Sequence, residues 1–333
     1  MATGMAPPRV VCGRVAVIGL GSMGLGMASS LVRSGFDVAG CDVSPGAVAR
    51  AVEAGVRGAA TPAEATAETD AVISAVVNAA QTEEVLFGEG GAAATMRPGA
   101  VFVSSATMSP DAARGLAQRV EALGCLYLDA PMSGGAQRAS EGALTFLASG
   151  SDAAFAQARD VLGAMGARLF ELGPEPGQGA AFKIINQLLA GVHIAAASEA
   201  IAFAARQNLD LRKVYDVITA SAGNSWMFEN RVPHMLAGDY APRSSVSIFV
   251  KDLGIVQDIA RSVHFPVPMA ATALQMFLMT SGAGMGDDDD ASVARLYARM
   301  TGTPLPDGPP SHDSLPRDPT GESRLGSSKR DGR

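Results

Sequence analysis

Lysine is rare in this chain, and one lysine stands in a setting suited to acid–base chemistry. The 333 residues include four lysines and 22 arginines. Arginine cannot act as a base at ordinary pH, whereas a lysine can do so when burial lowers its pKa. Lys183 lies near the start of a long apolar stretch, and Asn186 and Gln187 follow it on the same helical face. The spacing predicts one acid–base group and two amides in a common cleft; the structural alternative is a lysine that extends from an apolar helix to water.

A glycine-rich loop near the N-terminus is the second candidate for chemistry. It consists of Gly19, Leu20, Gly21, Ser22, Met23 and Gly24. The loop follows an apolar strand, opens a helix, and is followed 18 residues later by the acidic Asp42. In dinucleotide-binding proteins such glycines permit a sharp turn, close approach to a pyrophosphate and tight packing of helix on strand. The context predicts a dinucleotide site; a turn with only a structural purpose is the alternative.

Asp42 indicates which dinucleotide this site prefers. Its carboxylate can accept hydrogen bonds from both hydroxyls of an adenosine ribose, whereas a 2′-phosphate would meet a negative charge. Residues 43–49 contain no arginine that could reverse this preference. The sequence therefore favours NAD over NADP as the cofactor.

A third segment, Asp129-Ala130-Pro131-Met132-Ser133-Gly134-Gly135, follows an expected strand. Ligands of open α/β folds bind at the carboxyl ends of the strands. There Ser133 and the backbone amides of Gly134 and Gly135 could hold a carboxylate. A plain Ser-Gly-Gly turn is the alternative interpretation.

The elements that must position these residues follow an alternating pattern. The expected strands are Val15–Ile18, Phe36–Cys41, Ala71–Val77, Ala100–Val103, Leu126–Asp129, Leu144–Ala148 and Arg168–Glu171. Helical stretches separate them, which is typical of a parallel sheet with crossover helices. After residue 177 the strand signal ends, and helices are expected over 178–207, 210–221, 246–264, 268–281 and 288–301. We therefore predict an α/β fold in which a Rossmann-type doubly wound domain over residues 13–176 precedes an all-α domain over 177–302.

Composition narrows the possible functions. The net charge of −7 argues against a surface that binds nucleic acid. The three cysteines are at unrelated spacings, which indicate neither a disulfide framework nor a zinc site, and such cysteine use fits a protein of the reducing cytoplasm. The uncharged stretch 15–32 contains too many glycines to favour a signal peptide or membrane span. Residues 1–12 are expected to form a flexible arm and residues 303–333 a disordered tail. Asp287–Asp290 are expected to cap the last helix rather than bind calcium, so no metal is predicted.

Four motifs together resemble the β-hydroxyacid dehydrogenase family, which includes 3-hydroxyisobutyrate dehydrogenase, over about residues 13–300. They are the Gly19–Gly24 loop, Asp129–Gly135, Gly177-Gln178-Gly179 with Lys183 and Asn186, and Lys251-Asp252-Leu253. Further segments resemble the L-threonate dehydrogenase branch, which oxidises the C2 hydroxyl of L-threonate with NAD to 2-dehydro-L-erythronate. Those segments are Val76–Gln81, Lys183–Ile185, Gln187–Ala196, Ala222–Arg231 and Ile248–Leu253.

The resemblance implies roles for several residues. It implies that Lys183 is catalytic and that Asn78, Thr107 and Lys251 lie near the cofactor. Either Asn186 or Gln187 would orient the hydroxyl of the small-molecule hydroxyacid substrate. It also implies a homo-oligomer, a dimer or a larger assembly.

Some alternatives remain open at this point. Asn224 and Ser225 could bind the extra hydroxyls of a sugar acid or form a plain turn before Trp226. The substrate could instead be 3-hydroxyisobutyrate or tartronate semialdehyde, and a nucleotide-sensing module without catalysis is a more distant possibility. An imine reductase on this fold is disfavoured because Lys183 is present.

Overall fold

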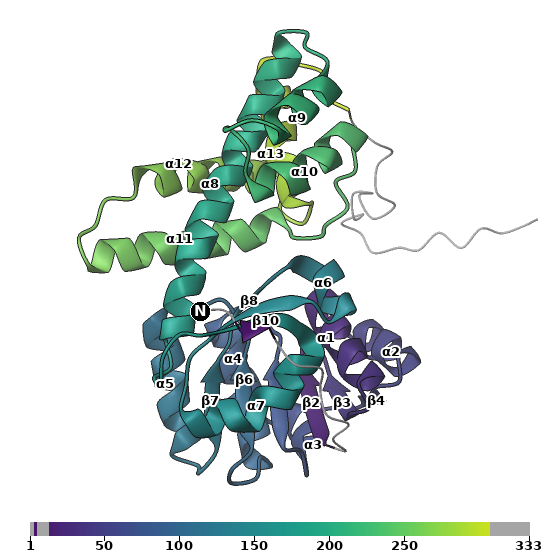
Figure 1. Ribbon diagram of the computed structural model, residues 1–333, viewed down its shortest axis with the longest axis vertical. Helices are drawn as coiled ribbons and strands as arrows, with labels where there is room; N and C mark the ends of the chain where they lie inside the picture. Colours follow the sequence, from purple (N-terminus) through teal and green to yellow (C-terminus); the bar gives the residue numbers. More distant parts are fainter. Residues whose placement is uncertain (1–2, 5–12, 307–333) are drawn as a thin grey trace, which may run out of the picture.

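The protein consists of a layered α/β half and a helical half. The computed structural model describes residues 3–4 and 13–306. Helix α8 (Gln178–Arg206) starts against the α/β half and runs the length of the helical half (Figure 1). The predicted fold class, a Rossmann-type parallel sheet followed by an all-α region, is confirmed.

The main sheet has six strands, all parallel, in the order β4-β3-β2-β5-β6-β7. The strands are β2 (Arg14–Ile18), β3 (Asp37–Cys41), β4 (Arg57–Gly58), β5 (Ala71–Ser74), β6 (Val101–Ser104) and β7 (Leu126–Asp129). The order changes direction at β2, where the chain crosses from one side of the sheet to the other. A ligand site is expected beside that strand, at its carboxyl end.

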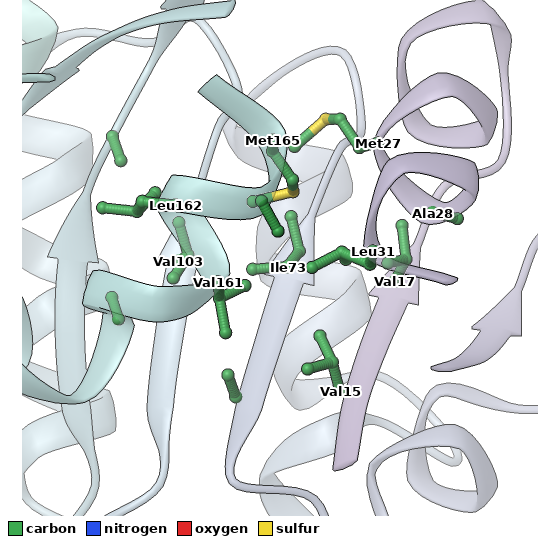
Figure 2. Close-up of a cluster of buried hydrophobic side chains, with 14 of the residues drawn as sticks. Val15, Val17, Met27, Ala28, Leu31, Ile73, Val103, Val161, Leu162 and Met165 are labelled. Carbon is green, nitrogen blue, oxygen red and sulfur yellow. The ribbon is translucent and has the colours of Figure 1, made fainter. Parts of the chain in front are cut away.

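Side chains alternate between the two faces of this sheet, and helices cover both. Val15 and Val17 face a cluster that α1 (Ser22–Arg33) and α7 (Asp152–Met165) complete, with Leu31 and Leu162 fully buried (Figure 2). Intervening residues such as Ile18 face the second cluster, which the helices α3 (Pro62–Thr66), α4 (Ala79–Phe87) and α5 (Pro110–Glu121) complete. Burial on both faces explains why these strands are continuous apolar runs.

The remaining helices of this half begin at local signals. They are α2 (Pro45–Glu53), α3 (Pro62–Thr66), α4 (Ala79–Phe87), α5 (Pro110–Glu121) and α6 (Gly135–Glu141), with the short 3-10 helix η1 (Ala92–Ala94). Ser44, Thr61 and Ser109 accept hydrogen bonds from the first turns of α2, α3 and α5, and a proline follows each of them. This cap and proline pattern is a strong helix start in sequence.

The last two strands of the predicted sheet form a separate sheet instead. β9 (Leu144–Ala148) and β10 (Gly166–Glu171) pair in parallel, and β8 (Met132–Ser133) and β1 (Thr3–Gly4) flank them in antiparallel orientation. A bridge between Asp129 and Ser149 connects the two sheets at the end of β7. The seven predicted strands are present, but the two-residue strands β1, β4 and β8 were not predicted. The expectation of one sheet was wrong, since pairing partners are a tertiary property.

The helical half is built around α8. The other elements are α9 (Leu211–Thr219), α10 (Trp226–Ala237), α11 (Val246–Ser262), α12 (Pro268–Thr280), the π-helix η2 (Ser281–Met285), the 3-10 helix η3 (Asp290–Ser292) and α13 (Val293–Thr301). α8 contacts α10, α11, α12 and α13, so it is a core helix. Of the described residues, α8 alone has the length and mean hydropathy, 1.7, of a membrane span, yet half of that stretch is buried in the protein. It does not indicate a membrane protein.

Helix α10 was not among the expected helices because it contains a proline. Pro233 lacks an N–H and so leaves the carbonyl of Glu229, four residues earlier, without its helical donor. The hydroxyl of Tyr215 on α9 donates to that carbonyl at 3.2 Å. Tertiary contact thus replaces the bond that the proline removes.

The segments predicted to be a flexible arm and a disordered tail lie at the two chain ends, and the structure describes only some of their residues. Of the arm expected over residues 1–12, Thr3 and Gly4 are described, and they form β1. Of the tail expected over 303–333, Thr303 is buried and its N–H donates to the carbonyl of Ala298, while Leu305 packs against the core. The rest of both segments lies outside the described residues.

Candidate active site

A cleft of about 860 Å³ lies between the two halves, and most of the predicted site residues line it. The predicted residues in its wall are Gly21, Ser22, Met23, Thr107, Ser133, Gly134, Gly135, Lys183, Asn186, Gln187 and Lys251. The cleft opens at the carboxyl ends of the parallel strands, where ligands of this fold class bind.

The glycine loop fits a bound pyrophosphate. Gly19 has a φ of +89°, and a Cβ on Gly24 would lie 1.8 Å from the carbonyl oxygen of Gly19, so both positions require glycine. Gly21, in contrast, has no protein atom within 4 Å of where its Cβ would be. That open space adjoins the start of α1, where no side chain caps the helix. The side chain of Leu20 is fully buried and only its backbone takes part. The loop therefore leaves free helical N–H groups beside room for a phosphate.

Asp42 lies at the end of β3 and fastens the same loop. The N–H of Leu20 donates to its Oδ2 at 2.6 Å, and the N–H of Ser44 donates to its Oδ1 at 2.8 Å. Each carboxylate oxygen can accept a further bond, so the group can still bind a ribose diol. Asp42 is not one of the residues that line the cleft, but it fixes the glycine loop, which does line it.

Lys183 is buried at the junction between the halves. Its side chain is only 8% exposed, and Nζ donates to Oε1 of Gln187 at 2.8 Å. Gln187 in turn donates through Nε2 to Oδ2 of Asp252 on α11. The amide of Gln187 thus connects the lysine to a carboxylate that is 1% exposed.

Burial alters the proton affinity of this lysine. Desolvation lowers the pKa of Lys183 to about 8, the negative charge of Asp252 opposes that shift, and the positive charge of Lys251 adds to it. A group with this pKa can exist as a neutral amine near physiological pH. Lys183 can therefore act as a general base.

Asn186 occupies a different position from its neighbour. It is exposed to the cleft, and its Nδ2 donates to Oε1 of Gln187 at 2.9 Å. This bond uses one of the two Nδ2 hydrogens, and the other remains for a further acceptor. Since Gln187 is buried and fully engaged by Lys183 and Asp252, Asn186 is the amide available to a molecule in the cleft.

Lys251 joins the helical half to the α/β half across the cleft. Its Nζ lies 2.7 Å from Oδ1 of Asp252 and donates to the carbonyl of Val77 at 2.8 Å and that of Thr107 at 3.4 Å. These carbonyls belong to the loops after β5 and β6. The Lys251–Asp252 pair is thus a partly buried link between domains, not a surface ion pair.

The start of α8 is fixed to the α/β half by groups from that half. Gly177, the residue before the helix, has no side chain to cap it. Instead Oδ2 of Asp129 accepts the N–H groups of Gly177 and Ala180 at 2.9 and 2.8 Å, and Oγ of Ser149 accepts that of Gly179 at 2.9 Å. Burial raises the pKa of Asp129 to about 6, against the effect of those hydrogen bonds. Lys183 lies in the second turn after this anchor.

Ser133 and the two glycines after it face the same cleft from the α/β side. Gly134 and Gly135 have φ values of +139° and +76°, which favour glycine. The turn so formed places Ser133 and the following backbone N–H groups beside the cleft that Lys183 also lines.

Besides Gly19, Leu20, Gly24 and Asp42, three further predicted residues are not part of the cleft wall. Oδ1 of Asn78 accepts the N–H of Gln81 and caps α4, and Oγ of Ser225 accepts the N–H of Phe228 and caps α10. Nδ2 of Asn224 donates to Oε1 of Glu229 at 2.6 Å. These side chains organise helix starts, and their predicted roles at the cofactor and the substrate stay predictions.

One wall of the cleft was not predicted from the sequence. Asp252 was named only beside Lys251, and no site role was predicted for Asn230, His234 or Arg243. Asp289 and Asp290, expected to cap the last helix, instead pair with His234 and Arg231, although Asp289 also caps η3. The acidic run was the available signal, but its partners lie on α10, more than 50 residues away.

Most of this chain is similar in sequence to proteins of known family. Residues 14–173 match the model described as the NAD binding domain of 6-phosphogluconate dehydrogenase, and residues 177–297 the NAD-binding model of NADP-dependent 3-hydroxyisobutyrate dehydrogenase. L-threonate dehydrogenase of Cupriavidus necator is 53% identical over 85% of this chain and 95% of that protein. That of Escherichia coli K12 is 49% identical over 86% and 95%.

A solved structure agrees with these sequence matches. The crystal structure of 3-hydroxyisobutyrate dehydrogenase from Salmonella typhimurium is 48% identical and covers 85% of this chain and 99% of its own, with a TM-score of 0.81. Both domain models and near-complete coverage of the relatives confirm the predicted membership. The chain belongs to the β-hydroxyacid dehydrogenase family of NAD-dependent oxidoreductases.

Proposed function

We propose that this protein oxidises the C2 hydroxyl of L-threonate with NAD and yields 2-dehydro-L-erythronate. The observation that carries the proposal is Lys183, a lysine 8% exposed with a pKa lowered to about 8 by burial, in a cleft that the glycine loop also lines. The identity to L-threonate dehydrogenases, 53% for the Cupriavidus necator protein, supports this substrate.

The cofactor would lie along the carboxyl edge of the sheet. Gly21 and the free N–H groups at the start of α1 would bind its pyrophosphate, and Asp42 its adenosine ribose, which favours NAD over NADP. Thr107 and Lys251 line the part of the cleft where the two halves meet, beside Lys183. The bound cofactor supplies an oxidised nicotinamide ring that accepts a hydride.

The protein's own groups would handle the rest of the substrate. Lys183, in its neutral form, accepts the C2 hydroxyl proton as C2 loses its hydride, so the alcohol becomes a ketone and the amine an ammonium. Asn186 donates its second Nδ2 hydrogen to the oxygen of the reacting hydroxyl, while Gln187 holds the lysine in place. Ser133 and the N–H groups of Gly134 and Gly135 bind the carboxylate.

The active protein is proposed to be a homo-oligomer in the cytoplasm. Along α8, Phe182, Ile185 and Leu189 are 55%, 61% and 49% exposed, and Phe203 continues the stripe at 64%. Spacings of three, four and fourteen residues place them on one face of the helix, which a second copy could cover about a two-fold axis. Cys41 and Cys125 are free thiols, which suits a reducing compartment.

Formation of NADH with a panel of acids tests the substrate. The protein and NAD are incubated with L-threonate, D-threonate and 3-hydroxyisobutyrate, and NADH absorbance is followed; tartronate semialdehyde is tested with NADH in the reductive direction. We expect turnover with L-threonate to exceed that with the other acids. Turnover of 3-hydroxyisobutyrate or tartronate semialdehyde without turnover of L-threonate would overturn the proposal.

A further inference from the structure

The part of the cleft wall that α10 and the segment after it form carries polar side chains that no step of the proposed reaction uses. Asn230 and His234 lie one helical turn apart on α10, and both line the cleft that contains Lys183 and Ser133. Arg243, from the segment after α10, also faces the cleft, but it is paired with Asp239 at 2.7 Å.

The hydrogen bonds behind His234 determine what its other nitrogen can do. Nδ1 lies 3.0 Å from Oδ1 of Asp289, and the N–H of Arg243 donates to Oδ2 at 3.1 Å. Although burial opposes it, the hydrogen bonds from His234 and the Arg243 N–H lower the pKa of Asp289, so this carboxylate is ionised. An ionised carboxylate only accepts, so Nδ1 of His234 carries the hydrogen and, in the neutral ring, Nε2 is an acceptor.

Asn230 presents a hydrogen-bond donor to the cleft, whereas Nε2 of His234 is an acceptor. Arg231 binds Asp290 through Nε at 2.5 Å and Nη2 at 2.9 Å, and its Nη1 donates to Oδ1 of Asn230. This contact occupies the carbonyl oxygen of Asn230 and leaves its NH₂ group as a donor. Among the described residues, neither that NH₂ group nor Nε2 of His234 has a protein partner.

A donor and an acceptor side by side on one wall match a group that can both accept and donate. A hydroxyl does so, a carboxylate only accepts, and a methyl group does neither. The ion pair behind this wall is buried, with Arg231 9% and Asp290 0% exposed. Because buried ion pairs contribute little to stability, we infer that this pair serves to fix the position of Asn230 in the cleft wall.

We propose that Asn230 and His234 form a subsite that binds an outer hydroxyl of the substrate, at C3 or C4 of a polyhydroxy acid. The inference rests on the proposed function, because it assumes that Ser133 holds the carboxylate and that Lys183 faces C2. It assigns to α10 the selection of polyhydroxy acids over acids with an aliphatic end.

The test compares substrates that lack one hydroxyl. Wild type, His234→Leu and Asn230→Leu are assayed with L-threonate, 2,3-dihydroxybutanoate, 2,4-dihydroxybutanoate and 2-hydroxybutanoate of matched configuration at C2. Each variant should lower kcat/KM for L-threonate by about 10- to 100-fold and that for the acid lacking the bound hydroxyl by less than about threefold. An equal loss for every acid, or no loss for L-threonate, would overturn the subsite.

Two controls keep structural damage apart from lost recognition. Asn230→Leu leaves the His234–Asp289 bond in place, so it remains informative if His234→Leu fails to fold. His264→Asn removes an exposed histidine outside the cleft and should change neither quantity.

A binding measurement separates this inference from the proposed function. Each acid is titrated calorimetrically into the enzyme–NADH complex. Absence of L-threonate turnover in wild type refutes the proposed function. The subsite is judged by whether the variants lose preference among the four acids in binding, and an unchanged preference refutes it.

Discussion

The two sides of the cleft are built by different means. On the side proposed to hold the cofactor, the loop 19–24 offers backbone N–H groups and empty space, and a single carboxylate, Asp42, fastens it. On the side proposed to be catalytic, Lys183, Gln187 and Asp252 form a chain of buried side chains that extends from α8 to α11. A backbone site tolerates changes in side-chain chemistry but not in side-chain volume. The network of Lys183, Gln187 and Asp252 should instead be sensitive to a change in side-chain chemistry even where the volume is kept.

Replacement of Lys183 should produce the largest effect. Lys183→Met keeps the length and apolar stem of the side chain but removes the base, so kcat should fall by about 1,000-fold while NADH binding is largely retained. Steady-state kinetics and NADH fluorescence titration measure the two properties. Lys213→Met, at a lysine 82% exposed, is the matched control and should keep full activity. Substantial turnover by Lys183→Met would exclude a base role.

The pH profile should report the ionisation of the same lysine. With a lowered pKa of about 8, about half of the lysine is neutral at pH 8 and about 1% at pH 6, so kcat/KM for oxidation should fall about 50-fold between these two pH values. Because Asp252 raises the pKa of Lys183, Asp252→Asn should move the midpoint to lower pH. A midpoint that Asp252→Asn leaves unchanged would assign the profile to another group.

Asp129 tests the connection between the two sides. Asp129→Ala leaves the buried N–H groups of Gly177 and Ala180 without an acceptor, and the free energy of unfolding should fall by about 2 kcal/mol. Ser149→Ala removes the acceptor of the Gly179 N–H and a longer bond of 3.4 Å to Asp129, and should cost about 1 kcal/mol. Urea unfolding followed by circular dichroism measures both. Equal stability of wild type and Asp129→Ala would show that the anchor of α8 is elsewhere.

Gly21 tests the cofactor side with a single methyl group. A Cβ at this position meets no protein atom, so Gly21→Ala should fold normally. The methyl group would occupy space intended for the pyrophosphate, and the Kd for NADH should rise about tenfold, or about 1.4 kcal/mol. Ser22→Ala, which adds no volume, should bind NADH like wild type. Unchanged NADH affinity in Gly21→Ala would place the phosphates elsewhere.

The fold and half of the site follow from local sequence signals. The alternation of short strands with helices, the caps of α2 and α5 and the spacing of the glycines are signals carried by residues close together in the chain. Asn186 and Gln187 lie on the same helix as Lys183. Helix α10 was missed because Pro233 is unfavourable locally, and only the hydroxyl of Tyr215, from another helix, compensates for it. The separate sheet of β8, β9, β10 and β1 was missed for a related reason, since a strand does not name its partner.

The sequence by itself determined that a dinucleotide loop, an unusual lysine and a serine–glycine turn are present, because each is encoded by neighbouring residues. Only the tertiary structure decided that Gln187 holds the lysine, that Asp252 moderates its pKa, and that Asn230 and His234 share its cleft. These contacts join residues dozens of positions apart. Their energies depend on burial, which exists only after the two halves have packed together.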